Sequence, residues 1–301
     1  MRFILYILLG YSFLSCRQTQ VNTQPEADFE GGIVIGKANN PMLNEISGMV
    51  ASKRNKGMFW VHNDSGDINK IFLIDSLAQI RAIFYLKDVE NRDWEDVAIT
   101  TINGETWLYI AEIGDNQAIF DTKYIYRFKE PSLNGSSLIE NIEKISFQYS
   151  DGNRDAEALL IDHDTQQLYI ISKREEKKRL YEISFIPGTV QTANFLSELN
   201  FSVSTNTSIP QLIQGQYIVA GDISPDNGEI LIKNYMQIFY WKKRENETLK
   251  ETLNRPPKQV PYMIEPQGEA IAFDTEGKGY YTISEADSDG VTSIIYYKKK
   301  L

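Results

Sequence analysis

Asn91-Arg92-Asp93-Trp94-Glu95-Asp96-Val97-Ala98-Ile99 is a stretch that recurs 62 residues later as Asn153-Arg154-Asp155-Ala156-Glu157-Ala158-Leu159-Leu160-Ile161. Both copies consist of Asn-Arg-Asp-x-Glu followed by an apolar run. Three weaker copies keep the apolar run, and the aligned position reads Ser47, Glu95, Glu157, Val219 and Glu269, at steps of 48, 62, 62 and 50 residues. A repeat of this length, carried by short strands, is typical of repeat folds such as the β-propeller.

The remainder of residues 31–301 supports this reading. Runs of Ile, Tyr, Phe and Val alternate with turns rich in Gly, Asp, Asn or Pro, which are strand and turn signals. The sequence therefore predicts an all-β fold, a five-bladed β-propeller with most blades of four strands. The outer strand of the fourth blade is expected near Leu249–Leu253. A six-bladed propeller is the alternative, because the segment 203–215 is long enough to conceal a degenerate blade.

The last repeat unit lacks a fourth strand, and a short apolar run near the N-terminus can supply it. We expect Gly32–Gly36 to pair with the last unit and so to close the ring. Closure removes an open sheet edge that would otherwise favour aggregation.

The N-terminus has the pattern of a targeting signal. Arg2 precedes an apolar run over residues 3–9, and residues 1–16 end at Cys16, the only cysteine of the chain. This arrangement resembles the lipobox of bacterial lipoproteins, in which the cysteine is lipidated. Residues 17–30 are polar and predict a flexible tether, so we expect a lipid-anchored protein of the cell envelope. The alternative is an ordinary signal peptide with an incidental cysteine.

Composition disfavours several classes of function. The net charge of −10 disfavours nucleic-acid binding and favours a cation or a cationic partner. With 2 histidines and 1 cysteine, the chain has almost no material for a zinc site or a Ser-His-Asp triad. We expect a monomer that meets the membrane only through its lipid anchor.

The repeated position predicts a metal site. In a propeller the inner strands would aim these side chains at a common axis, where three glutamates repel one another unless a hard cation lies between them. Calcium takes about 6–8 oxygen ligands. The expected ligands are Ser47, Glu95, Glu157, the carbonyl group of Val219 and Glu269. The alternative is that these glutamates pair with Arg92, Arg154 or Lys173 and only join neighbouring blades.

A polar loop follows the second strand of each unit. These loops should surround the ring of repeated residues and form a binding site for an anion. A cation flanked by guanidinium groups suits a phosphate or a carboxylate. Asp64 and Glu285 are the candidates for a general base that activates water. The candidate ligand-binding residues are His62, Arg92, Trp94, Asp115, Asn116, Arg154, Lys173 and Arg174, with Trp94 as a stacking platform.

The same residues resemble known calcium-binding propellers. Ser47, Glu95, Glu157 and Glu269 match the serine and glutamate positions that head the inner strands of the calcium-activated nucleotidase (apyrase) family, whereas Val219 departs from the side-chain oxygen of that family. Glu45-Ile46-Ser47-Gly48-Met49 and Trp60-Val61-His62-Asn63-Asp64 are similar to the opening of the esterase-like phytase and SdiA-regulated propeller families. The resemblance implies one central calcium ion beside a ligand site.

Two functions follow from these observations. The first is a calcium-dependent hydrolase of a phosphate or carboxylate ester, acting on a small anionic ligand. The second is a binding module without catalysis, which would hold a glycan, a peptide or an extracellular partner protein on the same charged face.

Overall fold

The computed structural model describes residues 28–200 and 210–300 of the chain. Cys16 and the expected signal peptide lie outside the described residues. The tether was expected to extend to residue 30, but this boundary is wrong, because Phe29 is buried and forms a β-bridge with Lys299. Within the described ranges, no helix has the length and apolar character needed to cross a membrane.

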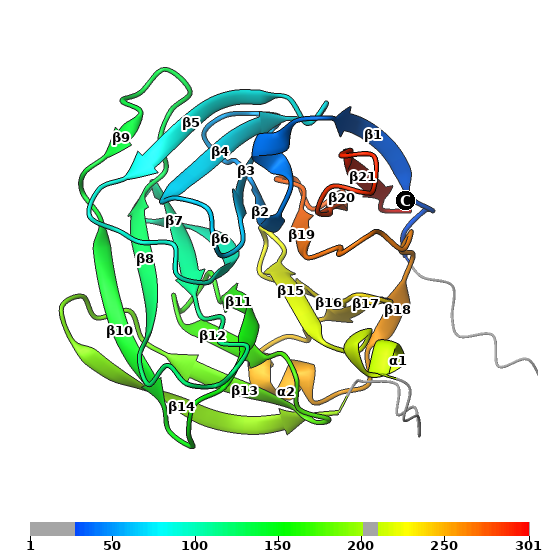
Figure 1. Cartoon of the computed structure of the whole chain (residues 1–301). Coiled ribbons are helices and arrows are strands. Elements are labelled where there is room, and N and C mark those ends of the chain that lie inside the picture. Colours follow the sequence, from blue (N-terminus) through cyan, green and yellow to red (C-terminus); the bar gives the residue numbers. More distant parts are fainter. Residues whose placement is uncertain (1–27, 201–209, 301) are drawn as a thin grey trace, which may run out of the picture.

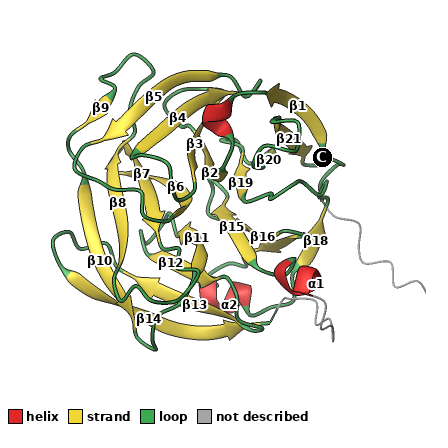
Figure 2. Cartoon of the chain, viewed as in Figure 1, coloured by secondary structure: helices red, strands yellow, loops and turns green. Residues whose placement is uncertain are grey.

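Strands dominate the described chain and form antiparallel groups (Figure 2). The first group follows a short 3-10 helix at Pro41–Leu43 and contains β2 (Ile46–Ala51), β3 (Met58–Asn63), β4 (Lys70–Asp75) and β5 (Ile80–Leu86), with β9 (Leu138–Ile139) added in parallel beside β5.

The next two groups merge into one sheet of eight strands. One half contains β6 (Trp94–Ile102), β7 (Glu105–Glu112), β8 (Lys123–Lys129) and β10 (Glu143–Tyr149). The other half contains β11 (Ala156–Ile161), β12 (Leu168–Ser172), β13 (Lys178–Ile183) and β14 (Val190–Leu199). The outer strands β10 and β14 pair in parallel and join the two halves.

The last two groups contain four strands each. One has the order β15 (Ile218–Ile223), β16 (Glu229–Asn234), β17 (Ile238–Lys242) and β18 (Lys258–Val260). The other has the order β1 (Ile33–Ala38), β21 (Thr292–Lys298), β20 (Gly279–Ile283) and β19 (Ala270–Phe273). The expected pairing of the N-terminal strand with the last strand is confirmed by the antiparallel ladder between β1 and β21.

The innermost strand of each of the five groups faces the middle of the molecule, and these strands are β2, β6, β11, β15 and β19. Each of these strands contacts the next: β2 contacts β6, β6 contacts β11, β11 contacts β15, and β15 contacts β19. The series closes where β19 contacts β2. Figure 1 shows these strands at the centre and the other strands of each group farther out. The all-β expectation is therefore confirmed.

Two short helices interrupt the strand pattern. The outer strand expected near Leu249–Leu253 is wrong, because these residues form α2, and the outer strand of that group is β18. A capping box between Thr248 and Glu251 begins this helix and satisfies its first backbone donors. In the segment proposed as a degenerate blade, Pro210–Gln214 forms α1, whereas residues 201–209 lie outside the described chain.

The apolar core lies between neighbouring strand groups. Trp60 and Trp94 pack between the first and second groups, Tyr109 and Tyr181 between the second and third, and Trp241 between the third and fourth. Burial of each such side chain contributes about 1.5–3 kcal/mol or more. The inner strands are therefore held rigidly against one another, which fixes the side chains at their N-terminal ends.

Candidate metal centre and adjoining cavity

The position that repeats along the sequence coincides with a recurring backbone feature. The register of the inner strand against its neighbour shifts across Ser47 in β2, Glu95 in β6, Glu157 in β11 and Val219 in β15. Glu269 immediately precedes β19. A β-bulge leaves one residue outside the ladder and changes the direction of its side chain. The repeat is thus a repeated bulge at one end of the inner strands.

These bulges help to bring carboxyl groups from different strands together. One carboxylate oxygen each from Asp64, Asp93 and Glu95 lies within 4.8 Å of the others, and the same holds for Glu95, Asp155 and Glu157. We call these five residues the acidic cluster. The expected convergence of Glu95 and Glu157 is present. Asp93 and Asp155 were missed as site residues, although both occupy the third position of the repeated Asn-Arg-Asp-x-Glu frame.

The other repeated residues have different contacts. The Ser47 hydroxyl group donates a hydrogen bond to the backbone oxygen of Glu95 at 3.0 Å. The Tyr235 hydroxyl group donates to the Glu269 carboxylate. Val219 is fully buried and contributes no polar side-chain atom. Ser47 therefore adjoins the acidic cluster directly, whereas Glu269 is held by Tyr235.

Burial and mutual repulsion disfavour the charged forms of these acids. Desolvation, with the charges of Asp64 and Asp155, raises the pKa of Asp93 to about 6. Burial raises the pKa of Glu95 well above its ordinary value, and nearby Asp64 adds to this effect. Desolvation and the Glu269 charge raise the pKa of Glu285 to about 7. The site therefore lacks positive charge relative to its carboxyl groups.

Two cationic side chains partly compensate the acidic cluster. The Lys173 ammonium group forms an ion pair with Glu157, and Arg174 Nε donates to Asp155 Oδ2 at 2.6 Å. Both residues directly follow β12, and β12 pairs with β11, the strand that carries the bulge at Glu157. The ion-pair alternative thus holds for one glutamate of the ring, through Lys173.

Arg92 and Arg154 lie elsewhere. Arg92 pairs with Glu112, with Nε 3.4 Å from Oε1, and its guanidinium group lies 4.2 Å from the centre of the Phe120 ring. Arg154 forms ion pairs with Asp151 at 2.9 Å and Glu175 at 2.7 Å. The alternative, in which the repeated glutamates pair with these arginines, does not hold for either one, because Glu112 pairs with Arg92, and Asp151 and Glu175 pair with Arg154.

Trp94 and His62 are unsuitable as ligand contacts. Both side chains are 0% exposed. The Trp94 indole donates to the backbone oxygen of Glu90 at 3.1 Å and packs edge to face against the His62 ring. The stacking role expected for Trp94 is wrong, because its position on β6 directs the ring into the core between the first two groups. Burial lowers the pKa of His62 to about 4, so this ring is neutral.

The loop after β7 supports the acidic cluster from one side. Asp115 is buried against Lys123 at 2.6 Å, and its backbone N–H donates to Asp155 Oδ1 at 2.8 Å. Asn116 accepts a hydrogen bond from Arg174. Asp115 therefore orients Asp155 of the acidic cluster, and Asn116 holds Arg174, the ion-pair partner of Asp155. The adjacent Gly114 leaves room for Glu95, since any Cβ atom there would collide with its carboxylate.

A cavity of about 560 Å³ adjoins the acidic cluster. Its lining includes Lys173, Arg174, Tyr217, Tyr235 and Gln267. Tyr217 stacks on Arg174 with 5.0 Å between the guanidinium group and the ring centre. The tyrosines were not predicted as site residues; the only signal was that Tyr235 belongs to a loop after a second strand. Polar and aromatic groups thus line a space beside the carboxylates.

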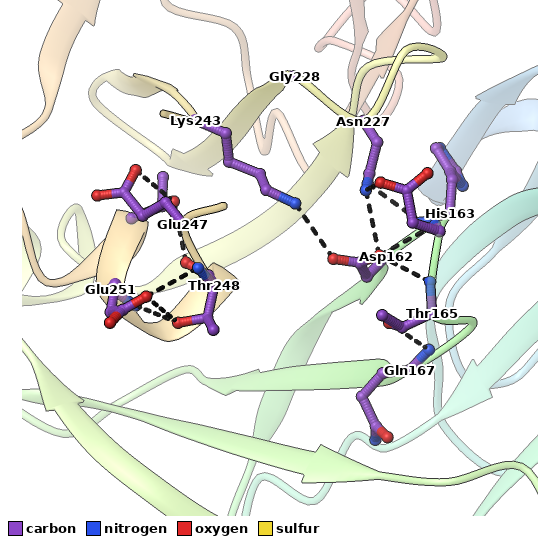
Figure 3. Close-up of polar contacts among 12 residues, drawn as sticks. Asp162, His163, Thr165, Gln167, Asn227, Gly228, Lys243, Glu247, Thr248 and Glu251 are labelled. Atoms are coloured by element: carbon purple, nitrogen blue, oxygen red, sulfur yellow. Dashed lines mark hydrogen bonds and ion pairs between the residues drawn. The ribbon is translucent and has the colours of Figure 1, made fainter. Parts of the chain in front are cut away.

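The far ends of the inner strands carry a different network (Figure 3). Asp162 directly follows β11, and its carboxylate accepts hydrogen bonds from Asn227 at 3.1 Å and Lys243 at 3.3 Å. Asn227 in turn accepts from the backbone N–H of His163 at 3.1 Å. Burial lowers the pKa of His163 to about 4. This network joins the third and fourth strand groups and is separate from the acidic cluster.

Comparisons with known proteins identify no family. No family model and no curated protein matches the chain. Among solved structures, the chain is similar to a luciferin-regenerating enzyme, with a TM-score of 0.48 and 10% identity over 90% of this chain and 98% of that chain. A likeness of this degree carries no argument about function.

Proposed function

We propose that the chain is a five-bladed β-propeller whose axis holds a calcium ion at the acidic cluster, and that a small anionic ligand binds beside this ion. The closed series of contacts among the five inner strands supports the blade count. The convergence of carboxylates from separate strand groups is the observation that carries the metal site.

The donor set fits a hard cation. Asp64, Asp93, Glu95, Asp155 and Glu157 offer carboxylate oxygens, which calcium and magnesium prefer over nitrogen or sulfur ligands. Glu157 is 2% exposed, and its Oε2 has no hydrogen-bond partner among the described residues. A buried carboxylate oxygen without a partner is costly. A divalent cation would remove this cost and the repulsion that raises the neighbouring pKa values.

A bound cation would also explain the adjoining cavity. Lys173 and Arg174 lie between the cluster and the cavity, where an anion could contact both the cation and a guanidinium group. If the ligand is an ester, the cation would polarise it. Glu285, with a pKa of about 7, is the better candidate for the general base, since Asp64 belongs to the proposed ligand set.

The same site without a general base would serve as a binding module for a glycan, peptide or partner protein. We further propose that Cys16 carries a lipid and that a monomeric domain is tethered to a membrane of the cell envelope. This part of the proposal rests on the sequence of residues 1–16 alone.

Calorimetric titration of the purified protein with calcium tests the metal site. We expect saturable binding that weakens at least tenfold in Glu157→Gln and stays unchanged in Glu140→Gln, a matched change at an exposed glutamate. Absence of calcium binding to the unaltered protein would refute the proposal.

Hydrolysis of 4-nitrophenyl phosphate and 4-nitrophenyl acetate, with calcium or with a chelator, then separates the two functions. Turnover that needs calcium and is lost in Glu285→Gln supports the hydrolase. Calcium binding without turnover of either ester favours the binding module.

A further inference from the structure

Lys173 combines a fixed backbone with a long side chain that reaches the acidic cluster. Its N–H donates to the backbone oxygen of Asp155 at 3.0 Å. Its carbonyl oxygen accepts from Lys178 Nζ at 2.9 Å and from the N–H of Ile218 at 3.2 Å. The peptide is thus anchored on both sides, whereas the four-carbon side chain can rotate. Its side chain is 10% exposed, which indicates contact with both protein and solvent.

The ammonium group of this lysine is the local counter-charge of the acidic cluster. It pairs with Glu157, and its charge lowers the pKa values of Asp93, Glu95 and Glu269 against the opposing effect of burial. Among the described residues, the other ion pair of the acidic cluster is that of Arg174 with Asp155. Lys173 therefore lies where a bound cation would exert the same attraction.

An ammonium group is nevertheless a poor match for so many oxygens. It has three donors, whereas calcium accepts about 6–8 oxygen ligands. Glu157 illustrates the mismatch, because one of its oxygens pairs with Lys173 while buried Oε2 stays without a partner among the described residues. A compact divalent ion would satisfy both oxygens and replace the ammonium group.

The displaced ammonium group has a defined destination. Lys173 lines the cavity of about 560 Å³ beside the cluster. Arg174 cannot make the same movement without breaking its bonds to Asp155 and Asn116. Tyr217 and Gln267 on the cavity wall can accept hydrogen bonds from a lysine that turns toward them.

We propose that Lys173 couples the two ligands of the site: a divalent cation takes its place at Glu157, and the released ammonium group binds a phosphate or carboxylate in the cavity. This inference rests on the proposed function. Each ligand then favours the other, because the anion holds Lys173 away from Glu157, and the cation makes Lys173 available to the anion. Such coupling is reciprocal and typically amounts to about 5–150-fold in affinity.

Lys173→Met tests the inference, because it removes the competing ammonium group and keeps an unbranched apolar stem. We expect this variant to bind calcium at least fivefold more tightly than the unaltered protein. Phenyl phosphate, the anionic probe, should bind the unaltered protein at least fivefold more tightly with saturating calcium than with a chelator. This enhancement should be smaller in the variant, which keeps only the direct attraction between the cation and the anion.

Lys177→Met is the matched control, since Lys177 is exposed and pairs with Glu198 on the surface. It should leave both affinities unchanged. Equal or weaker calcium binding by Lys173→Met, with normal calcium binding by the unaltered protein and an unchanged circular dichroism spectrum, would overturn the inference and leave the metal site intact. Absence of calcium binding to the unaltered protein would instead refute the proposed function itself.

Discussion

Replacing Asp93 with asparagine should make the protein more stable at neutral pH in the presence of a chelator. Burial and the charges of Asp64 and Asp155 raise the pKa of Asp93 from 3.8 to about 6. A carboxyl group whose pKa is raised by folding contributes most stability below pH 3.8, and this contribution is lost as the pH rises through about 6. Asparagine has nearly the same shape and does not ionise, so the variant avoids this loss.

The size of the effect follows from the shift in pKa. A difference of about two pKa units corresponds to about 3 kcal/mol in the free energy of unfolding. Solvent screening reduces the repulsion felt by a partly solvated carboxyl group, so we expect about 1–2 kcal/mol. The gain should be complete above about pH 7 and absent below about pH 3.5.

Urea denaturation at pH 5.0 and pH 7.5, in a chelator and in saturating calcium, measures this effect. In chelator the variant should be the more stable protein at pH 7.5, with a smaller difference at pH 5.0. Calcium at about 100 times its dissociation constant should stabilise the unaltered protein by about 2.7 kcal/mol. The variant should gain less, because it has lost a ligand.

Asp88→Asn is the control, since Asp88 is an exposed turn residue with φ of 57°, a conformation that asparagine also adopts. Its effect should stay within about 0.5 kcal/mol. A less stable Asp93→Asn variant in chelator at pH 7.5 would show that the Asp93 carboxylate is satisfied by the protein alone, and the argument for a missing positive charge would fail.

Three further predictions concern neighbouring features. Trp94→Ala should lower the free energy of unfolding by about 3–5 kcal/mol in urea denaturation, as expected for a fully buried ring; a negligible loss would contradict its assignment to the core. Gly114→Ala should weaken calcium binding at least tenfold in calorimetric titration, because the new methyl group collides with Glu95. Gly104→Ala, at an open position with φ of 81°, should cost stability only. Thr248→Ala should lower the free energy of unfolding by about 1 kcal/mol through loss of the α2 cap, with calcium binding unchanged.

The repeated Asn-Arg-Asp-x-Glu frame predicted where the inner strands begin because the same β-bulge recurs at that position. Each bulge needs the same local arrangement, and Glu95 and Glu157 therefore share sequence as well as position. Asp93 and Asp155 were visible in the same frame, but spacing alone did not show that a residue two places earlier reaches the same centre. The carboxylates at the bulged ends of the inner strands could therefore be predicted from the local sequence pattern.

Other parts of the site depend on contacts between distant segments. The cavity brings together Lys173, Tyr217, Tyr235 and Gln267, which belong to three strand groups and have no common motif. The prediction that Trp94 stacks on a ligand was wrong because its polar neighbours in the sequence suggested an exposed side chain. The alternation of side chains along β6 instead directs the ring into the core between the first two groups. The fold likewise determines which acidic residue forms an ion pair with a given arginine, as it does for Arg92 and Glu112.

The parallel ladder between β10 and β14 makes the contact between the second and third strand groups different from the contacts between other neighbouring groups. Ser146 to Tyr149 pair with Val190 to Ala193, so the second and third groups share main-chain hydrogen bonds in addition to side-chain packing. Between the last and first groups the described sheets share no strand ladder, and the joint has side-chain packing and the hydrogen bond from the Ala286 N–H to the backbone oxygen of Asn44 at 2.9 Å. Thermal opening should therefore be least frequent at the joint of the second and third groups, and amide protons along β2 should exchange with deuterium sooner than those along β10.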